Sequence, residues 1–352
     1  KATEPWMSKL SDYRKLSKLL STYVDGILDR QINGKIHTSM LQFGTTSGRY
    51  SSTNPNLQNL PRLKEDDSGV SELVLKYSNQ IKKGFIAGQG SKIVNADYSS
   101  LEPVCFAHCS GDQKLKDVFI KGYDLYSVVG IETFDLKGVS ADKTAPNYLK
   151  NIMPEMRQKA KEFVLSVPYG AEEGQISRKL AISWNEAKDV IGNYLNKFPG
   201  LKTYMNRCNY MAKTKGMVTS ELGRIRHLKE ARSIYTLFSD KVLDSRWAKA
   251  NGHSLTRSKL RNLLNNAKNF PIQSLAASLV NRAMIATAIE FKKNNINGYI
   301  ALQIHDEICC VVEESQAKLA SDILKNCMEK TTSISVPLNA EPLIADNFGD
   351  AK

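Results

Sequence analysis

Two acidic residues stand beside apolar runs that are typical of buried strands. Residues 92–96 read Lys-Ile-Val-Asn-Ala, and Asp97 follows them directly. Asp306 lies in a polar His-Asp-Glu step between the two apolar runs of residues 298–313. We expect a tight turn at 305–306 that lifts Asp306 to the edge of a sheet, where it can face Asp97. Carboxylates in such positions are suited to hold Mg²⁺, which prefers oxygen ligands.

Each carboxylate also has an ordinary structural explanation. Ser99 and Glu102 have the spacing of a capping box, in which Ser99 caps a helix and Glu102 is its third residue. Asp306 alone is typical of a polar hairpin turn. Zinc binding by His305 is disfavoured, because no second His or Cys lies at ligand spacing. The capping box and the metal site can both hold.

Cationic, apolar and aromatic side chains recur every four residues from Arg157 to Tyr169. Lys161 and Leu165 lie between them, so a helix from about Pro154 to Ser166 would align the first three in one stripe that Tyr169 continues. Two cations at one end of the stripe can hold a triphosphate, and a ring at its other end can hold a base. A solvated basic face is the competing interpretation.

Residues 41–62 are rich in Gly, Ser, Thr, Asn and Pro, and we expect an extended segment with many turns. This composition offers hydrogen-bond donors of the kind that contact phosphates and sugars. A long surface loop is the alternative, although a loop of this length inside a domain is usually functional.

The composition favours a polyanionic partner. Lys and Arg total 49 and Asp and Glu total 36, so the net charge is +13. Nucleic acid is the usual partner of such a chain, and a basic protein without one is the alternative. The six cysteines form no CxxC pair, which indicates buried thiols in an intracellular protein. No stretch approaches the roughly 20 apolar residues of a membrane span, so we expect no membrane partner.

Hydrophobic periodicity predicts a mixed chain with strands near both ends and a helical middle. Residues 236–262 are polar, basic and irregular, and we expect them to be partly mobile. The predicted helices cover residues 7–30, most of 113–221, 270–295 and 315–331.

Four motifs in this order resemble those of the family A DNA polymerases, the group of bacterial polymerase I and many phage replicative enzymes. They are SGRYSSTNPNLQNLP at 47–61, DYSxxE at 97–102, RxxxK followed by YG at 157–170, and HDE at 305–307, accompanied by Asn269 and Gln273. The resemblance implies an α+β right hand with an antiparallel palm sheet, helical fingers and a partial thumb. The implied domains are the thumb at 1–30, the palm at 31–102 and 263–352, and the fingers at 103–262.

The resemblance also implies an activity, the template-directed addition of dNTPs to a primer 3′-OH by two-metal phosphoryl transfer. Asp97 and Asp306 would bind two Mg²⁺ ions, with Mn²⁺ as a substitute, and Glu307 would support the metal site. Lys161 would be the general acid for the leaving pyrophosphate. The expected partners are primer-template DNA, dNTPs and a processivity factor or other replisome proteins, and no exonuclease is expected in this chain.

Further residues receive binding roles from the resemblance. Glu102 would be the steric gate that excludes a ribose 2′-OH, and Tyr169 would lie near the templating base. The implied nucleotide-binding residues are Tyr98, Glu102, Arg157, Lys161, Leu165 and Tyr169. The implied DNA-binding residues are Arg49, Asn56, Gln58, Asn269, Gln273 and His305.

The chain departs from the family pattern on its helical side. Leu165 stands where the family usually has Phe or Tyr, which affects sugar selection and rate. Pro168 should end or kink the helix just before Tyr169. Val104 replaces a usual Arg, and Tyr126 replaces a usual His.

Two alternative functions stay open. A single-subunit RNA polymerase shares the two-Asp palm, although a Glu at the gate favours deoxynucleotides. A catalytically silent DNA-binding module is the second alternative. Phage, bacterial and organellar origins all fit the sequence, with a phage origin first.

Overall fold

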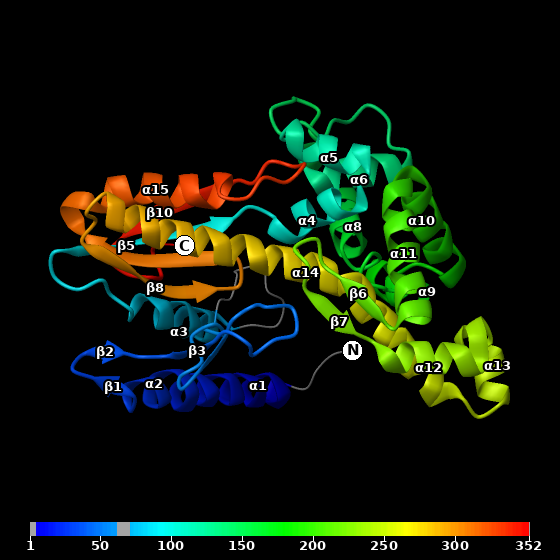
Figure 1. The fold of residues 1–352 in the computed structure, drawn as a ribbon, viewed down its shortest axis with the longest axis horizontal. Coiled ribbons are helices and arrows are strands. Elements are labelled where there is room, and N and C mark those ends of the chain that lie inside the picture. The colour runs from blue at the N-terminus through cyan, green and yellow to red at the C-terminus, as the bar shows by residue number, and fades with distance from the viewer. Residues whose placement is uncertain (1–4, 62–70, 352) are drawn as a thin grey trace. The chain divides into compact units, whose positions relative to one another are not determined.

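The computed structural model describes residues 5–61 and 71–351, and the chain divides into two compact units. We call them the sheet unit and the helical unit, and Figure 1 labels the elements of both. The expected α+β class with an antiparallel sheet is confirmed. The sheet unit comprises Lys1–Ser99, Ala277–Thr332 and Leu338–Lys352, and the helical unit comprises Ser100–Ala276 and Ser333–Pro337.

A four-stranded antiparallel sheet in the order β10-β5-β9-β8 forms the centre of the sheet unit. Every side chain at positions 93–96 of β5 is buried, as expected for a central strand with both faces covered. The hairpin predicted over 298–313 is confirmed, with its turn at 305–306. The strands are β5 (Ser91–Tyr98), β8 (Gly298–Ile304), β9 (Glu307–Glu313) and β10 (Ala340–Ala345).

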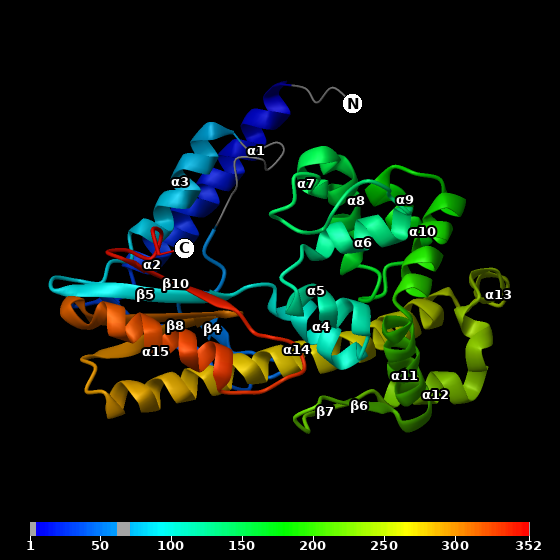
Figure 2. The same ribbon diagram turned by 90° about the horizontal axis from the view of Figure 1, so that it is seen from above.

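Successive side chains of β5 point to opposite faces of the sheet. On one face, helix α15 (Ala317–Lys330) packs along β5 and β10, as Figure 2 shows. The hydroxyl of Tyr98 donates to the carbonyl of Met328 on this helix at 2.6 Å. On the other face, Ile93 joins an apolar cluster with Leu57 and Phe348. Asp97 lies on this second face, because it is four residues beyond Ile93.

The N-terminal part of the sheet unit is helical and then turn-rich, as predicted. The helix expected over 7–30 appears as three consecutive stretches that end at Leu28, and residues 1–4 of the expected thumb lie outside the described residues. The elements are α1 (Pro5–Lys18), the π-helical η1 (Leu19–Asp25), α2 (Gly26–Leu28), β1 (Gln31–Ile32), β2 (Lys35–Ile36), β3 (Ser39–Leu41), β4 (Ser51–Thr53) and α3 (Glu72–Lys83).

The helical unit is built around aromatic side chains. The rings of Phe134, Phe163, Tyr194 and Phe198 follow one another edge to face with centroids 5.4–5.9 Å apart. Its elements are α4 (Leu101–Ser110), α5 (Gln113–Ile120), α6 (Leu125–Phe134), α7 (Leu149–Ile152), α8 (Pro154–Val164), α9 (Glu173–Leu180), α10 (Trp184–Lys197), α11 (Pro199–Lys215), β6 (Met217–Thr219), β7 (Ile225–His227), α12 (Lys229–Phe238), the 3₁₀ helix η2 (Ser239–Leu243) and α13 (Ser245–Ala250).

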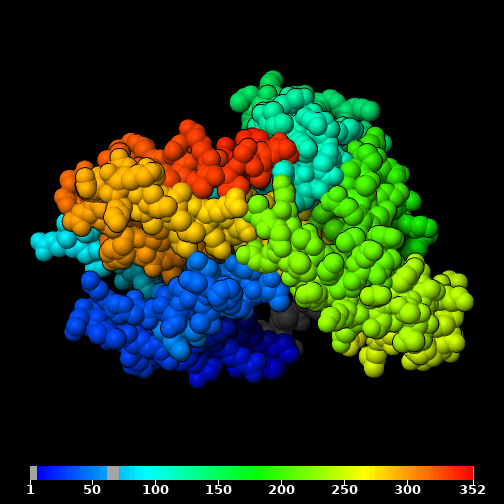
Figure 3. Space-filling model, viewed as in Figure 1, coloured from blue at the N-terminus to red at the C-terminus, as the bar shows by residue number. Residues whose placement is uncertain are grey.

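The prediction of an irregular segment at 236–262 is wrong, and its partial mobility stays a prediction. This segment contains the end of α12, η2, α13 and the start of α14. The yellow-green part around α13 protrudes in the space-filling view (Figure 3). Asp244 caps α13 by accepting from two backbone N–H groups at 2.8 Å. The rings of Phe238 and Trp247 both pack on the His253 ring, with ring centroids 4.6 and 5.7 Å from that of His253. These contacts order a segment whose polar composition hid its helices.

Helix α14 (Ser254–Lys293) is longer than predicted, because it begins before residue 270 and continues through Pro271. The border between the two units falls within it, at residues 276 and 277. By length and composition α14 could cross a membrane, but 56% of its most apolar stretch is buried inside the protein, as in a core helix.

Helix α8 ends at Val164, before the residue 166 that the sequence predicted. Pro168 has no N–H to donate to the Val164 carbonyl, although the neighbouring bonds from Val167 to Phe163 and from Tyr169 to Leu165 are present. The buried hydroxyl of Tyr194 donates to the Val164 carbonyl instead, at 3.0 Å. A side chain of α10 therefore satisfies the acceptor that proline leaves without a main-chain donor.

We expect Tyr194→Phe to lower the free energy of unfolding by about 1–2 kcal/mol, because it leaves the buried Val164 carbonyl unsatisfied. In a Pro168→Ala background the main chain regains a donor for this carbonyl, so the cost of Tyr194→Phe should fall. Urea unfolding of the double-mutant cycle measures the coupling. Tyr210→Phe is the control, since Tyr210 is 60% exposed. If Tyr194→Phe lowered the free energy of unfolding equally in the wild type and in Pro168→Ala, this explanation of how α8 ends would be contradicted.

Candidate active site

Asp97 and Asp306 lie at the same end of adjacent strands in the sheet unit. The backbone N–H of Tyr98 donates to the backbone carbonyl of Asp306 at 3.2 Å, which joins the end of β5 to the hairpin turn. His305 has φ 54°, as a tight two-residue connection between antiparallel strands requires. Asp97 is exposed and Asp306 is half-buried, so both carboxylates belong to one accessible edge of the sheet.

Glu307 has a different environment from the two aspartates. It stands opposite Asp97 in the register of β5 and β9, yet its side chain is only 1% exposed. The Asn95 amide donates to its carboxylate at 2.6 Å and to the Ala351 carbonyl at 3.0 Å. The Glu307 carboxylate therefore ties β9 to β5 from inside the unit, which fits its predicted supporting role.

The two aspartates fit Mg²⁺ better than a metal that needs an all-protein cage. Within residues 5–61 and 71–351, no three His, Cys, Asp or Glu residues gather closely enough to enclose an ion. Mg²⁺ is commonly held by one or two carboxylates, with water and substrate phosphates as the other ligands. An accessible carboxylate pair with a buried third acid beside it suits that coordination.

The capping box predicted at Ser99 and Glu102 does not form. Helix α4 begins at Leu101 after Ser100, which has φ 59° and makes no side-chain cap. The Ser99 N–H donates to the Asn339 carbonyl at 2.9 Å, so the chain stays attached to the sheet unit through residue 99. The Glu102 carboxylate is thus available for another partner.

That partner is Tyr169, whose hydroxyl donates to the Glu102 carboxylate at 2.5 Å. The Tyr169 ring also packs edge to face on Phe106, with ring centroids 5.0 Å apart. Gly170 follows with φ 99°, and a Cβ atom there would lie 1.9 Å from Asn265 Oδ1, so only glycine fits. The structure therefore joins two predicted site residues that are 67 positions apart in sequence.

The stripe predicted from Arg157 to Tyr169 is only partly helical. Arg157 and Lys161 lie within α8, whereas Leu165 is its C-cap and Tyr169 lies in the following turn. Lys161 is exposed, and Leu165 and Tyr169 are half-buried. The two cations are thus placed by a helix, and the ring is placed by its bond to Glu102.

Arg157 has a partner that the sequence did not reveal. Its Nε and Nη2 donate to the two carboxylate oxygens of Asp124 at 2.7 and 2.9 Å, and its guanidinium lies 5.2 Å from the Tyr126 ring centroid. Burial alone would raise the pKa of Asp124, but hydrogen bonds from Arg157 and Ser127 hold it below the ordinary value. Asp124 thus fixes the orientation of Arg157 and occupies two of its five N–H donors.

The Tyr98 side chain does not lie beside Asp97, and nucleotide binding by Tyr98 stays a prediction. The side chain is 3% exposed, points to the face covered by α15 and donates a hydrogen bond from its hydroxyl to the Met328 carbonyl. Alternation along β5 puts it on the opposite face from Asp97. Its backbone, at the end of β5, remains beside Asp306.

Four of the predicted DNA-binding residues belong to the sheet unit. Gln58 Nε2 donates to the Gln303 carbonyl at 3.0 Å, and the Asn56 side chain accepts from the Gln58 N–H at 3.0 Å. Gln303 Nε2 in turn donates to the His305 carbonyl at 2.7 Å. Through Gln303, which the sequence did not single out, the turn-rich segment is joined to the hairpin beside Asp306.

The remaining members of the predicted DNA-binding set are Arg49, also in the sheet unit, and Asn269 and Gln273 in the helical unit. Arg49 is half-buried, and its carbonyl accepts from the Thr45 hydroxyl at 2.7 Å. Asn269 and Gln273 lie one turn apart on α14 in the helical unit, where Asn269 Oδ1 is buried without a hydrogen-bond partner among the described residues. The unpaired acceptor of Asn269 marks this turn as a place where a ligand group can bind.

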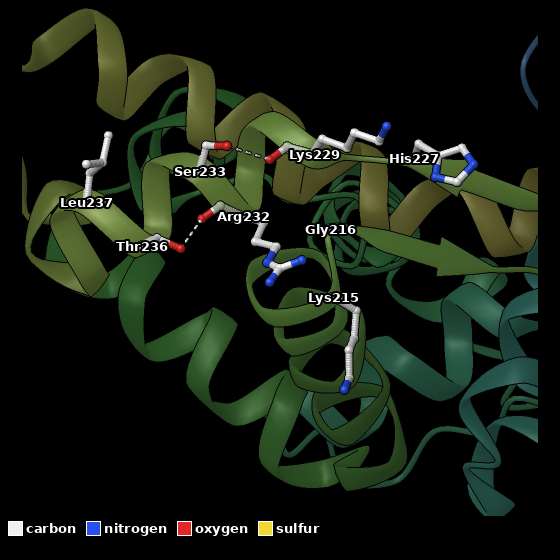
Figure 4. Close-up of a pocket in the computed structure, with 8 residues that line it drawn as sticks. All are labelled: Lys215, Gly216, His227, Lys229, Arg232, Ser233, Thr236 and Leu237. Atoms are coloured by element: carbon white, nitrogen blue, oxygen red, sulfur yellow. Dashed lines mark hydrogen bonds between the residues drawn. The ribbon is translucent and has the colours of Figure 1, made fainter.

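The helical unit also has a basic surface pocket of about 570 Å³ that contains none of the predicted site residues. Figure 4 shows it between the end of α11, strand β7 and the start of α12. Its cationic and titratable side chains are Lys215, His227, Lys229 and Arg232. The pocket adds to the positive charge expected to meet a polyanion.

Comparisons with known proteins agree on one family. The family model described as DNA polymerase family A matches residues 1–350. DNA polymerase I of Caldicellulosiruptor bescii is 31% identical over 97% of this chain and 35% of its own length. The thermostable DNA polymerase I of Thermus filiformis is 30% identical over 100% of this chain and 37% of its own length. The chain thus spans about a third of these curated relatives.

A solved structure supports the same relationship. The POL domain of Pol1 from M. smegmatis, in complex with DNA primer-template and dNTP, matches with a TM-score of 0.79 at 29% identity. The match covers 99% of this chain and 54% of that one. The similarity therefore extends over nearly the whole of both units described above.

We expect Asp124→Asn to destabilise the protein by about 1–3 kcal/mol at pH 7, because Arg157 loses its charged acceptor while the helix cap is kept. Since the folded pKa of Asp124 is depressed, its contribution is present above the ordinary value of 3.8 and is lost as the pH falls through the folded value. Urea unfolding should show that wild type and Asp124→Asn differ less in their free energy of unfolding near pH 3 than at pH 7. The control is Asp135→Asn, which removes an exposed pair with Lys197. If Asp135→Asn lowered the free energy of unfolding as much as Asp124→Asn does, this role of Asp124 would be contradicted. The same holds if the effect of Asp124→Asn did not change with pH.

Proposed function

The chain belongs to DNA polymerase family A, and from this premise we propose that it catalyses DNA-directed DNA synthesis by adding dNTPs to a primer 3′-OH. One observation carries the proposal, the joining of Asp97 and Asp306 at one accessible edge of an antiparallel sheet. The family resemblance drawn from the motifs is confirmed by the match to the family model over residues 1–350.

Asp97 and Asp306 would hold two Mg²⁺ ions, with Mn²⁺ as a substitute. When bound, the ions would lower the pKa of the primer 3′-OH and neutralise charge on the triphosphate. The buried Glu307 would keep the ends of β5 and β9 in register through its bond from Asn95. Loss of this support would displace Asp97, because the two residues are direct cross-strand neighbours.

The helical unit would supply the contacts to the incoming nucleotide. Arg157 would present the N–H donors that Asp124 does not use to the triphosphate, in an orientation fixed by the bidentate pair. Lys161, exposed one turn further along α8, would donate the proton that the leaving pyrophosphate needs. The ordered Arg157 and the exposed Lys161 thus suit different tasks, binding and proton transfer.

Glu102 would exclude a ribose 2′-OH. The Tyr169 hydroxyl holds its carboxylate in place, so the gate has a fixed position rather than the freedom of an exposed glutamate. Leu165 would contact the sugar through apolar atoms only. The Tyr169 ring, supported by Phe106, would lie near the templating base.

The DNA contacts would come from both units. Arg49, Asn56, Gln58 and His305 would meet the primer end or the minor groove in the sheet unit, and Asn269 and Gln273 would do so in the helical unit. We assign the thumb to 1–30, the palm to 31–102 and 263–352, and the fingers to 103–262. An intracellular location, replisome partners and the lack of an exonuclease site in this chain complete the proposal.

We expect Asp306→Asn to reduce primer extension by about a hundredfold or more, because an amide replaces a charged metal ligand. Primer-template binding should stay close to that of the wild type. Gel-based extension and fluorescence anisotropy measure the two properties. Asp322→Asn, at an exposed position of α15, is the matched control.

The same extension assay with dNTPs and with NTPs separates the proposal from its alternatives. A preference for dNTPs supports a DNA polymerase, whereas a preference for NTPs would assign an RNA polymerase activity. Extension at the wild-type rate by Asp306→Asn would show that Asp306 is not a metal ligand. No extension by the wild type on a bound primer-template would favour a silent DNA-binding module.

We expect Leu165→Tyr to change the ratio of dideoxynucleotide to deoxynucleotide incorporation, because it adds a ring and a hydroxyl where an apolar side chain is expected to meet the sugar. Competition between ddNTP and dNTP in single-nucleotide extension measures this ratio. Leu319→Tyr, the same substitution at an exposed position of α15, is the control. An unchanged ratio in Leu165→Tyr would show that this side chain does not contact the sugar.

A further inference from the structure

A second cavity of about 260 Å³ lies in the helical unit and is partly open to solvent. It is lined by the turn after α8, which carries Gly170, by α10, α11 and η2, and by α14. Much of its wall is apolar, and Ile191, Leu195, Leu243 and Leu264 contribute to it. Apolar cavities with a few convergent polar groups are typical of small-molecule sites.

The cavity contains a buried cation. Lys268, on α14, lines it and is only 6% exposed. Among residues 5–61 and 71–351, none accepts a hydrogen bond from Lys268 Nζ, and no carboxylate lies within 4.0 Å of it. Burial lowers the pKa of Lys268 to about 8, so the amine still carries its charge at neutral pH. A buried charge without a partner is costly, and a bound anion would remove that cost.

The nearest acid does not neutralise Lys268. Glu172 also lines the cavity, but its carboxylate is paired with Arg261 at 2.5 Å and lies 3.8 Å from Arg257. The group of Lys268, Arg257, Arg261 and Glu172 therefore has an excess of positive charge. The cavity should select anions over neutral or cationic molecules of the same shape.

A second buried polar atom lines the same cavity. Asn209 Oδ1, on α11, has no hydrogen-bond partner among the described residues. Buried polar atoms without partners are rare in folded proteins and point to a missing ligand or water. Lys268 and Asn209 thus supply two polar groups to a cavity that is otherwise lined largely by apolar side chains.

We propose that this cavity binds a small amphipathic monoanion, a carboxylate on a short apolar or aromatic body. The carboxylate accepts from Lys268 Nζ, and the body packs against the side chains of Ile191, Leu195 and Leu264. Asn209 Oδ1 meets the water or N–H group that accompanies the carboxylate. Gly170 and Ala171 line the cavity, so a bound ligand supports the turn that follows Tyr169.

Isothermal titration of the full chain with benzoate and with benzamide tests the proposal at pH 7. The two probes share the aromatic body, and only benzoate is charged. We expect benzoate to bind at least about tenfold more tightly than benzamide, as a charge-assisted hydrogen bond provides. No binding of benzoate, or equal binding of both probes, would overturn the proposal without any variant.

Two variants locate the site. Lys268→Met keeps the length of the side chain and removes its charge, so benzoate should bind at least about tenfold more weakly. Lys259→Met removes an exposed charge from the same helix and should leave benzoate binding unchanged. An unchanged affinity in Lys268→Met would overturn the proposal. The titration needs no polymerase activity, so its failure is distinct from a failure of the proposed function.

Discussion

The pairing of β5 with β9 is the constraint on which the rest of the sheet unit depends. Side chains alternate between faces, so a slip of one residue would move Asp97 to the face covered by α15. The buried bond between Asn95 and Glu307 opposes such a slip, because breaking it would remove a hydrogen bond from a carboxylate in the interior. Apart from Asn95, the buried part of the strand is apolar, and the strand becomes acidic at Asp97, where it reaches solvent. One register thus serves both the core and the candidate metal site.

In the helical unit, the corresponding constraint is the way in which α8 ends. Proline at 168 removes a main-chain donor, and Tyr194 replaces it, so the chain leaves the helix before Leu165 without a buried unpaired carbonyl. The turn that follows carries Tyr169 to Glu102 and packs Gly170 on Asn265. A departure from the family pattern is therefore accommodated by packing in α10. The residues expected to meet the nucleotide depend on contacts with three other segments.

The elements that the sequence predicted well have strong local patterns. The strand that ends at Asp97, the hairpin at 305–306 and the helix over 315–331 each combine periodicity with clear turn or boundary residues. The segment around α13 was missed because polar residues dominate it, and its order comes from one cap and three packed rings. The partner of Arg157 was missed because Asp124 lies 33 residues away and looks only like a helix cap. The capping box failed because tertiary bonds hold the preceding backbone in the sheet unit.

The hydrogen bond between Tyr169 and Glu102 couples two positions that are 67 residues apart in the sequence, so their side chains are expected to change together in evolution. A change at position 169 alters the support of the carboxylate at 102 even when Glu102 itself is unchanged. Lineages that exchange one of these side chains would therefore be expected to adjust the other. For directed evolution toward modified sugars, libraries that vary positions 102 and 169 together would search combinations that single-site libraries never sample.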